Sequence, residues 1–193
     1  MNGIKFESGQ NGSIITYNGL TPKIHSSVFI CEGVRIIGDV EIGKDCSVWY
    51  NTVIRGDVHY IRIGEKTNIQ DLCMLHVTNG KFPLNIGSEV TIGHSVAIHG
   101  ATIHDKCLIG IGAMILDGSV VGSHSLIAAG ALVREGFTVP EGVLVAGVPG
   151  KIVRDLKPEE IEKIEKSAVN YCGYTDEYKN QYKINNNINR KNV

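Results

Sequence analysis

The 193-residue chain has no excess charge of either sign, because its 19 lysines and arginines are matched by 20 aspartates and glutamates. Nucleic acid or an anionic membrane would therefore meet no net attracting field. No run of 18 apolar residues occurs, and the opening MNGIKFESGQNG lacks the basic start and apolar stretch of a secretory signal. We therefore expect a soluble, cytoplasmic protein that binds neither nucleic acid nor membrane.

Closely spaced cysteines are also lacking. The chain has five cysteines, Cys31, Cys46, Cys73, Cys107 and Cys172, and none forms the C-x-x-C pair of zinc knuckles and redox motifs. Thiols of a cytosolic protein are kept reduced. We expect these cysteines to be reduced and structural.

Glycine, by contrast, is abundant, and most of its 23 copies belong to a repeat of six residues. Glycine often follows the first residue of a hexad, as Gly43, Gly64 and Gly87 do, and a small or β-branched residue often stands fifth. Two insertions and one dropped residue interrupt the series. Ile, Leu or Val opens the hexads at positions 24, 30, 36, 42, 48, 54, 63, 69, 75, 86, 92, 98, 103, 109, 115, 121, 127, 133, 139 and 145.

A period of six residues suits neither an amphipathic helix nor a hairpin meander. It fits a parallel β-helix in which each hexad supplies one short strand and one turn, and three hexads make one triangular coil. From about residue 20 to 150 the pattern resembles the left-handed β-helix of hexapeptide-repeat proteins, and the hand is implied by that resemblance. We expect an all-β solenoid, a left-handed parallel β-helix over 20–154, preceded by an N-terminal cap segment over 1–19.

The stretch after Lys157 changes to helical spacing. It opens with Pro158 and two acids, as the N-terminus of a helix does. Apolar residues then recur with a helical period, at Ile161, Ile164, Ala168, Tyr171 and Tyr178. We expect a C-terminal α-helix over 155–182 that caps the solenoid, followed by a disordered polar tail over 183–193.

Three of the seven histidines lie in two short segments, LHVTNG (Leu75–Gly80) and IGHSVAIHG (Ile92–Gly100). His76 and His99 are each second in hexads that lie one coil apart on the same face. Neighbouring strands are about 4.8 Å apart, so the two imidazoles can share one metal ion. Arg55 is second in the hexad one coil earlier and belongs to the same row.

His94 belongs to a different face. It is third in the hexad that begins at 92, one coil beyond Asp71 and near Gln70, and it is poorly placed to reach the other two histidines of its own chain. A neighbouring subunit can supply it instead, because three-sided prisms pack as cyclic trimers whose interface closes after three copies. Three neutral imidazoles with an open fourth position are the ligand set of a catalytic zinc site. We predict three equivalent metal sites at the interfaces of a homotrimer.

The segments RGDVHYIRIGEKTNIQD, LHV, IGHSVAIHG and IGIGAMILDG resemble the gamma-class carbonic anhydrases, in particular their short bacterial branch, from about residue 15 into the C-terminal helix. The resemblance implies a lyase that converts CO₂ and bicarbonate, with one Zn²⁺ or Fe²⁺ at each subunit interface. It also implies these roles: His76, His94 and His99 as metal ligands, Arg55 and Asp57 as an intersubunit ion pair, Asp71 as a second partner of Arg55, Gln70 as the residue that orients water at the metal, and Tyr171 as a side chain that reaches the site from the helix.

Two departures from that family concern proton transfer. Val58 stands where the longer enzymes carry a glutamate, and the loop Thr78–Leu84, TNGKFPL, contains no carboxylate. The departures leave the rate of the enzyme open and are compatible with weak activity. The proton would then pass to solvent, to buffer or to a nearby histidine such as His59.

Two other functions fit the same scaffold. Hexapeptide β-helices also include acyltransferases that use a CoA-type donor, and the segment AGVPGKIVR (Ala146–Arg154) resembles the ending of both groups. An acyltransferase needs only one basic histidine, whereas this chain stacks two and supplies a third. A non-catalytic, metal-binding structural subunit is the other alternative, and loss of both glutamates would be its mark.

Overall fold

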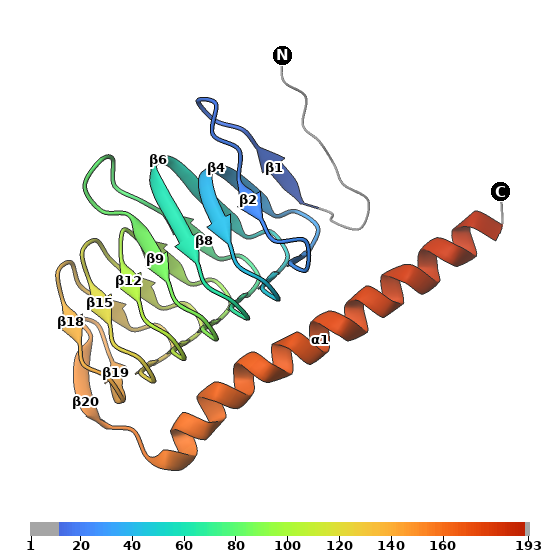
Figure 1. Ribbon diagram of the computed structural model, residues 1–193. Helices are drawn as coiled ribbons and strands as arrows, with labels where there is room; N and C mark the ends of the chain where they lie inside the picture. Colours follow the sequence, from blue (N-terminus) through green and yellow to red (C-terminus); the bar gives the residue numbers. More distant parts are fainter. Residues whose placement is uncertain (1–11, 192–193) are drawn as a thin grey trace.

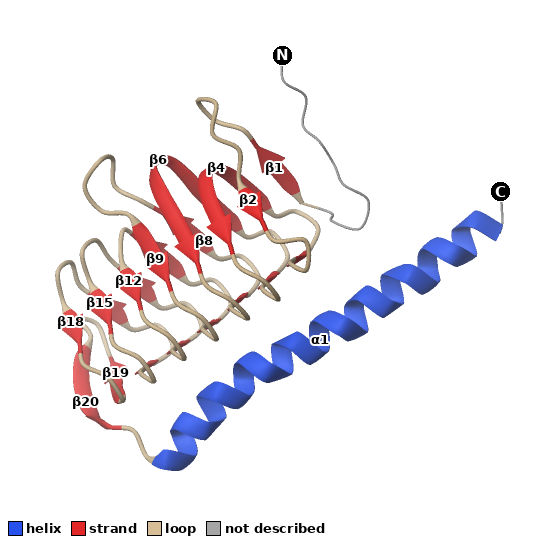
Figure 2. Ribbon diagram, in the orientation of Figure 1, coloured by secondary structure: helices blue, strands red, loops and turns tan. Residues whose placement is uncertain are grey.

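The computed structural model describes residues 12–191, with side chains up to residue 181. The chain winds into a left-handed parallel β-helix of about seven coils, and one long helix lies beside it (Figure 1). Short strands stack along the three sides of the prism, and turns form its corners (Figure 2). The expected all-β solenoid with a C-terminal helix is confirmed.

The prism has three faces, two of which belong to one sheet because two long strands run round the corner between them. Face 1 consists of β1 (Ser13–Ile15), the first halves of β4 (Arg35–Ile42) and β6 (Val53–Ile63), β8 (Met74–His76), β11 (Ala97–His99), β14 (Met114–Ile115) and β17 (Leu132–Val133). Face 2 consists of β2 (Lys23–Ile24), the second halves of β4 and β6, β9 (Leu84–Ile86), β12 (Thr102–Ile103), β15 (Val120–Val121) and β18 (Thr138–Val139).

Face 3 is a separate sheet, and it ends in the one antiparallel strand pair between named strands of the described residues, β19 with β20. Its strands are β3 (Phe29–Ile30), β5 (Ser47–Val48), β7 (Asn68–Ile69), β10 (Thr91–Ile92), β13 (Leu108–Ile109), β16 (Leu126–Ile127), β19 (Val143–Ala146) and β20 (Lys151–Asp155). The other strands pair in parallel, each with the strand one coil away, so residues of equal rank in their hexads lie side by side.

The first residue of each hexad points into the prism. Every predicted apolar position from Ile30 to Val145 is buried, with at most 4% of its surface exposed. Ile98, for example, lies between Leu75 and Ile115 of the neighbouring coils. The six-residue period is therefore the period of core packing, because each hexad must place one branched apolar side chain in the interior.

The buried cysteines complete this core. All five thiols are free, and burial raises the pKa of Cys31, Cys46, Cys73 and Cys107 to about 12. The folded protein is therefore expected to react with Ellman's reagent at the half-buried Cys172 alone, and at all five thiols after unfolding in guanidinium. Rapid labelling of several thiols per folded chain would contradict this prediction.

The two insertions in the repeat take different forms. The first does not leave the sheet: β6 stays extended from Val53 to Ile63 and pairs with β4 through an irregularity between Gly38 and Val40. The second forms the short loop Thr78–Leu84, which an antiparallel bridge between Thr78 and Phe82 closes. Both insertions lie beside the histidine row of face 1.

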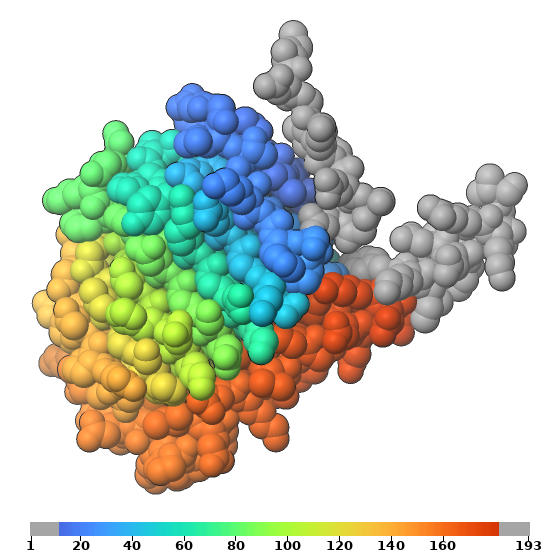
Figure 3. Space-filling view, in the orientation of Figure 1, coloured from blue at the N-terminus to red at the C-terminus, as the bar shows by residue number. Residues whose placement is uncertain are grey.

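Helix α1 (Pro158–Lys191) packs along face 3, contacting β5 and β10, and its visible part borders the prism in Figure 3. It begins at Pro158 and not at 155, because the Glu160 carboxylate accepts a hydrogen bond from the Lys157 backbone N–H at 2.9 Å and so caps the first turn. Ile164 and Ala168, two residues of the predicted apolar stripe, are each 1% exposed.

The ends of the elements differ from those expected. The solenoid starts before residue 20, since β1 already pairs with β4. The helix continues to Lys191 and not to 182, because the segment after Gly173 contains no glycine or proline to stop it. Residues 1–11 of the expected cap and 192–193 of the expected tail lie outside the described residues. From residue 12 to 191, no helix is both long and apolar enough to cross a membrane.

Candidate metal centre

Strands β8 and β11 place His76 beside His99 on face 1, as the hexad register predicted. His76 Nδ1 lies 3.0 Å from His99 Nε2, and the two ring centroids are 4.9 Å apart. Their side chains are 15% and 32% exposed, so the nitrogens are accessible from the surface of the subunit.

A carboxylate contacts the far nitrogen of each ring. His76 Nε2 lies 3.0 Å from Asp57 Oδ1, while Asp57 Oδ2 accepts a hydrogen bond from Arg55 Nη1 at 2.6 Å. His99 Nδ1 lies 2.6 Å from Asp117 Oδ1. The sequence reasoning missed Asp117. Its position in the repeat could have indicated it. Asp117 is third in the hexad that begins at 115, so it lies one coil beyond Gly100, the residue after His99.

The local electrostatics affect the pKa of His76 and of the two carboxylates. Burial is the largest influence on His76 and lowers the pKa of its ring, so the ring is neutral at pH 7. Burial would raise the pKa of Asp57 and Asp117, but the hydrogen bonds that they accept outweigh it, and both values lie below the ordinary one. An ionised carboxylate that contacts a ring nitrogen favours the tautomer with its proton on that nitrogen. In that tautomer the two nitrogens that lie 3.0 Å apart, His76 Nδ1 and His99 Nε2, present their lone pairs to each other.

Two facing lone pairs repel unless a cation lies between them, so the pair suits a metal ion. Two nitrogens bound to one tetrahedral zinc at about 2.0–2.1 Å are about 3.3 Å apart, close to the observed 3.0 Å. The donor set therefore fits two of the positions around such an ion. Within the described side chains of one subunit, no three His, Cys, Asp or Glu residues gather closely enough to hold an ion.

His94 lies in the turn between β10 and β11, at the corner between faces 3 and 1, apart from the His76–His99 pair. Its Nδ1 is 2.6 Å from Asp71 Oδ2, and its side chain is 45% exposed. Each of the three histidines thus has its own carboxylate. The resemblance implied that Arg55 pairs across the interface, but within one chain it contacts Asp57, and Asp71 contacts His94.

Gln70 and Tyr171 lie on the same side of the subunit as His94. Gln70 is 6% exposed, and its Nε2 donates to Asn68 Oδ1 at 3.2 Å. Tyr171 comes from α1 and packs edge-on against Trp49, with ring centroids 5.6 Å apart. Burial, and then the negative charge of Asp71, raise the pKa of the Tyr171 hydroxyl. The predicted residues therefore form two groups. The first lies on face 1 and consists of Arg55, Asp57, His76 and His99. The second lies at the corner between faces 3 and 1 and on the adjoining face 3, and it consists of Gln70, Asp71, His94 and Tyr171.

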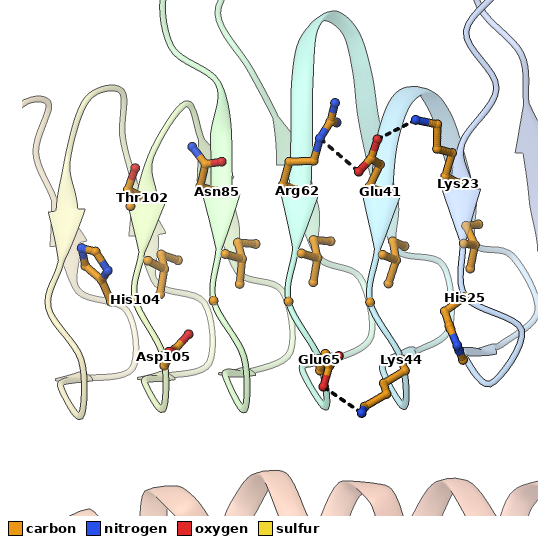
Figure 4. A pocket seen from close by; sticks show the side chains of 18 residues that line it. Lys23, His25, Glu41, Lys44, Arg62, Glu65, Asn85, Thr102, His104 and Asp105 are labelled. Carbon is orange, nitrogen blue, oxygen red and sulfur yellow. Dashed lines mark hydrogen bonds and ion pairs between the residues drawn. The ribbon is translucent and has the colours of Figure 1, made fainter.

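A groove of about 900 Å³ lies elsewhere, on face 2 (Figure 4). Its floor includes Gly43, Gly64 and Gly87, where the backbone of the next coil leaves too little room for a side chain. Charged side chains along it pair with one another, as Lys23 does with Glu41 at 2.9 Å. No predicted site residue lines this groove, so it does not compete with the histidines as the candidate site.

Comparison with known proteins gives two kinds of relative. The family model of the bacterial transferase hexapeptide, six repeats, matches residues 21–56 and 100–135. A probable carbonic anhydrase of Methanocaldococcus jannaschii is 54% identical over 148 residues, 77% of this chain and 92% of that protein. A carbonic anhydrase of Geobacillus kaustophilus is 46% identical over 166 residues, 86% of this chain and 91% of its own length.

The chain also resembles a longer plant protein and a protein of known structure. Gamma carbonic anhydrase 2, a mitochondrial protein of Arabidopsis thaliana, is 46% identical over 78% of this chain, which spans only 56% of the plant protein. A crystal structure from Bacillus cereus, provisionally called an acetyltransferase, superposes with a TM-score of 0.86 at 41% identity and covers 89% of this chain and 99% of its own.

Proposed function

The chain belongs to the gamma carbonic anhydrase family, whose enzymes are lyases, and we propose that it converts carbon dioxide and bicarbonate at metal sites shared between subunits. One observation carries the proposal: each of the imidazoles of His76 and His99 contacts a carboxylate through one nitrogen, and their other nitrogens lie 3.0 Å apart. His94, held by Asp71 in the same way, is exposed at the adjacent corner and is assigned as the third ligand, donated to the next subunit.

An exposed apolar strip supports assembly through this corner. Leu72 and Ile111 occupy turns between faces 3 and 1 and are 61% and 57% exposed, and Val148, in the turn between β19 and β20, is 68% exposed. Met74 and Met114, on the adjoining edge of face 1, are 42% and 41% exposed. Large apolar side chains grouped in this way mark a protein interface. A corner that packs on a face of the next copy makes a heterologous contact, which closes as a cyclic trimer with three sites.

A Zn²⁺ or Fe²⁺ ion held by three neutral imidazoles, with an open fourth position, would supply Lewis-acid activation of water near neutral pH. The protein's own contribution is orientation. Asp57, Asp71 and Asp117 determine which nitrogen of each ring is free, and they fix the planes of the rings. Arg55 in turn holds Asp57.

Gln70 and Tyr171 are assigned to the half of the site that brings His94. The amide of Gln70 is nearly buried and hydrogen-bonded to Asn68, so it can orient a water molecule with little loss of entropy. The raised pKa of Tyr171 keeps its hydroxyl protonated and able to donate to an oxygen of the substrate. Because Val58 and the loop Thr78–Leu84 supply no carboxylate, buffer or solvent accepts the proton.

Protein purified without oxygen and reloaded with Fe²⁺ or Zn²⁺ is expected to hydrate CO₂ in a stopped-flow assay and to lose that rate when a chelator removes the metal. The rate is also expected to rise with the concentration of an imidazole buffer, because a base from solution must take the proton. A protein that holds one metal per subunit but does not hydrate CO₂ would contradict the proposal and favour a structural subunit. If that protein instead turned over acetyl-CoA, acyl transfer would be favoured.

We further place this enzyme in the cytosol. All five cysteines are free thiols, which is the state that a reducing compartment maintains. Fluorescence microscopy of the tagged chain in its own cells tests the assignment, and a signal confined to a membrane-bound organelle or to the cell exterior would contradict it.

A further inference from the structure

The loop Thr78–Leu84 is a small, closed hairpin beside the histidine row. Two backbone hydrogen bonds join Thr78 and Phe82, at 3.1 Å and 3.3 Å. The backbone N–H of Gly80 also donates to the carbonyl oxygen of Val58 at 3.3 Å, which ties the tip of the loop to β6. The backbone of Thr78 is therefore held in place on the side of the site that faces Asp117.

Thr78 holds the carboxylate that contacts His99. Its hydroxyl donates to Asp117 Oδ2 at 2.6 Å, while Asp117 Oδ1 lies 2.6 Å from His99 Nδ1. Each oxygen of the carboxylate thus has one fixed partner. Rotation of the carboxylate would break both contacts, so the Thr78 hydroxyl determines the plane in which Asp117 meets the ring of His99.

Two glycines make room for this arrangement. A Cβ on Gly100 would overlap Asp117 Oδ1 and would lie 2.7 Å from Phe82 Cβ. A Cβ on Gly118 would lie 2.9 Å from Phe82 Cε1. Both glycines have positive φ, 54° and 66°, which other residues adopt only with strain. Phe82 therefore packs directly on the backbone of two coils and anchors the loop next to Asp117.

We propose that Thr78, Phe82 and Asp117 are positioning residues for His99, a group that we call the His99 clamp. Phe82 anchors the loop, Thr78 orients Asp117, and Asp117 keeps the proton of His99 on Nδ1 so that Nε2 faces His76. The inference rests on the proposed function, because it treats His99 as a metal ligand. The loop that lacks carboxylates for proton transfer thus orients a ligand.

The test removes the hydroxyl without changing the size of the side chain. Thr78→Val is expected to weaken Zn²⁺ binding about 10-fold, measured by competition with a chromophoric chelator, because loss of an outer-shell partner of a ligand costs about 10–100-fold. Thr78→Ser keeps the hydroxyl and is expected to bind as the wild type does. Thr138→Val, at the exposed first residue of β18, is the matched control. The melting temperature of each metal-free variant is expected to stay within about 2 °C of the wild type.

A second variant tests the route through Asp117. Asp117→Asn alone is expected to weaken Zn²⁺ binding about 10–100-fold, and adding Thr78→Val to it is expected to have little further effect, because the hydroxyl acts through the carboxylate. Unchanged affinity of Thr78→Val, an additive double variant, or a loss matched by a lower melting temperature would overturn the inference. A wild-type chain that binds Zn²⁺ but does not hydrate CO₂ would refute the proposed function alone. The Zn²⁺ affinities of the Thr78 and Asp117 variants would still test the His99 clamp.

Discussion

Replacement of His99 by alanine is expected to remove metal from the purified protein and to reduce CO₂ hydration to the rate of the buffer. Structural zinc sites bind with about 10–16 kcal/mol over four ligands, so one ligand is worth about 3 kcal/mol. That corresponds to a dissociation constant for zinc that is about 100- to 1,000-fold larger. His99 also carries contacts to His76 and Asp117, so its loss removes one partner of each and leaves His76 with Asp57 and Asp117 with Thr78. Metal content by mass spectrometry and stopped-flow rates measure the two effects.

The matched control for this substitution is His104→Ala. His104 is an exposed histidine of the same chain that lines the groove of face 2, away from the histidine row. It is expected to retain the metal content and the hydration rate of the wild type. A His99→Ala protein that keeps its metal and its rate, or a His104→Ala protein that loses them, would contradict the assignment of the site to face 1.

The hexad pattern predicted the parts of the fold that depend on the core. An inward position such as Ile98 repeats because the prism has one cross-section along its length, and stacking in register then follows from backbone hydrogen bonding between coils. The interruptions were harder to interpret, because a skipped repeat does not reveal whether the chain bulges out or stays in the sheet. Strand β6 stays in the sheet, whereas Thr78–Leu84 leaves it.

In the candidate site, too, some contacts could be predicted from the repeat and others could not. Hexad rank alone predicts that His76 lies beside His99, because rank fixes which side chains are neighbours, and their nitrogens are 3.0 Å apart. Rank also sets His94 near Asp71. Asp117 escaped prediction because its contact with His99 depends on side-chain rotamers and on the space left by a glycine, and neither follows from the period of the sequence.

Mixing two inactive variants is expected to restore activity if His94 acts across the interface. In a trimer that contains His94→Ala and His99→Ala chains together, one interface always joins an intact His76–His99 face to an intact His94 corner. Random assembly of equal amounts therefore regenerates about one site in four, and trimers purified through a different tag on each chain carry about one intact site in three. Neither variant alone forms any intact site. Recovery is measured as zinc bound per trimer and as CO₂ hydration rate.

A control mixture of two other variants tests whether recovery requires a site shared between subunits or follows from mixing subunits in general. His76→Ala and His99→Ala change two residues of the same face, whose nitrogens are 3.0 Å apart within one chain, so no arrangement of these chains restores a complete site. This mixture is expected to recover neither metal nor activity. Mixed trimers of the first pair that bind no metal would mean that His94 does not complete the site of a neighbour. Equal recovery in both mixtures would mean that the ligand set differs from His76, His94 and His99.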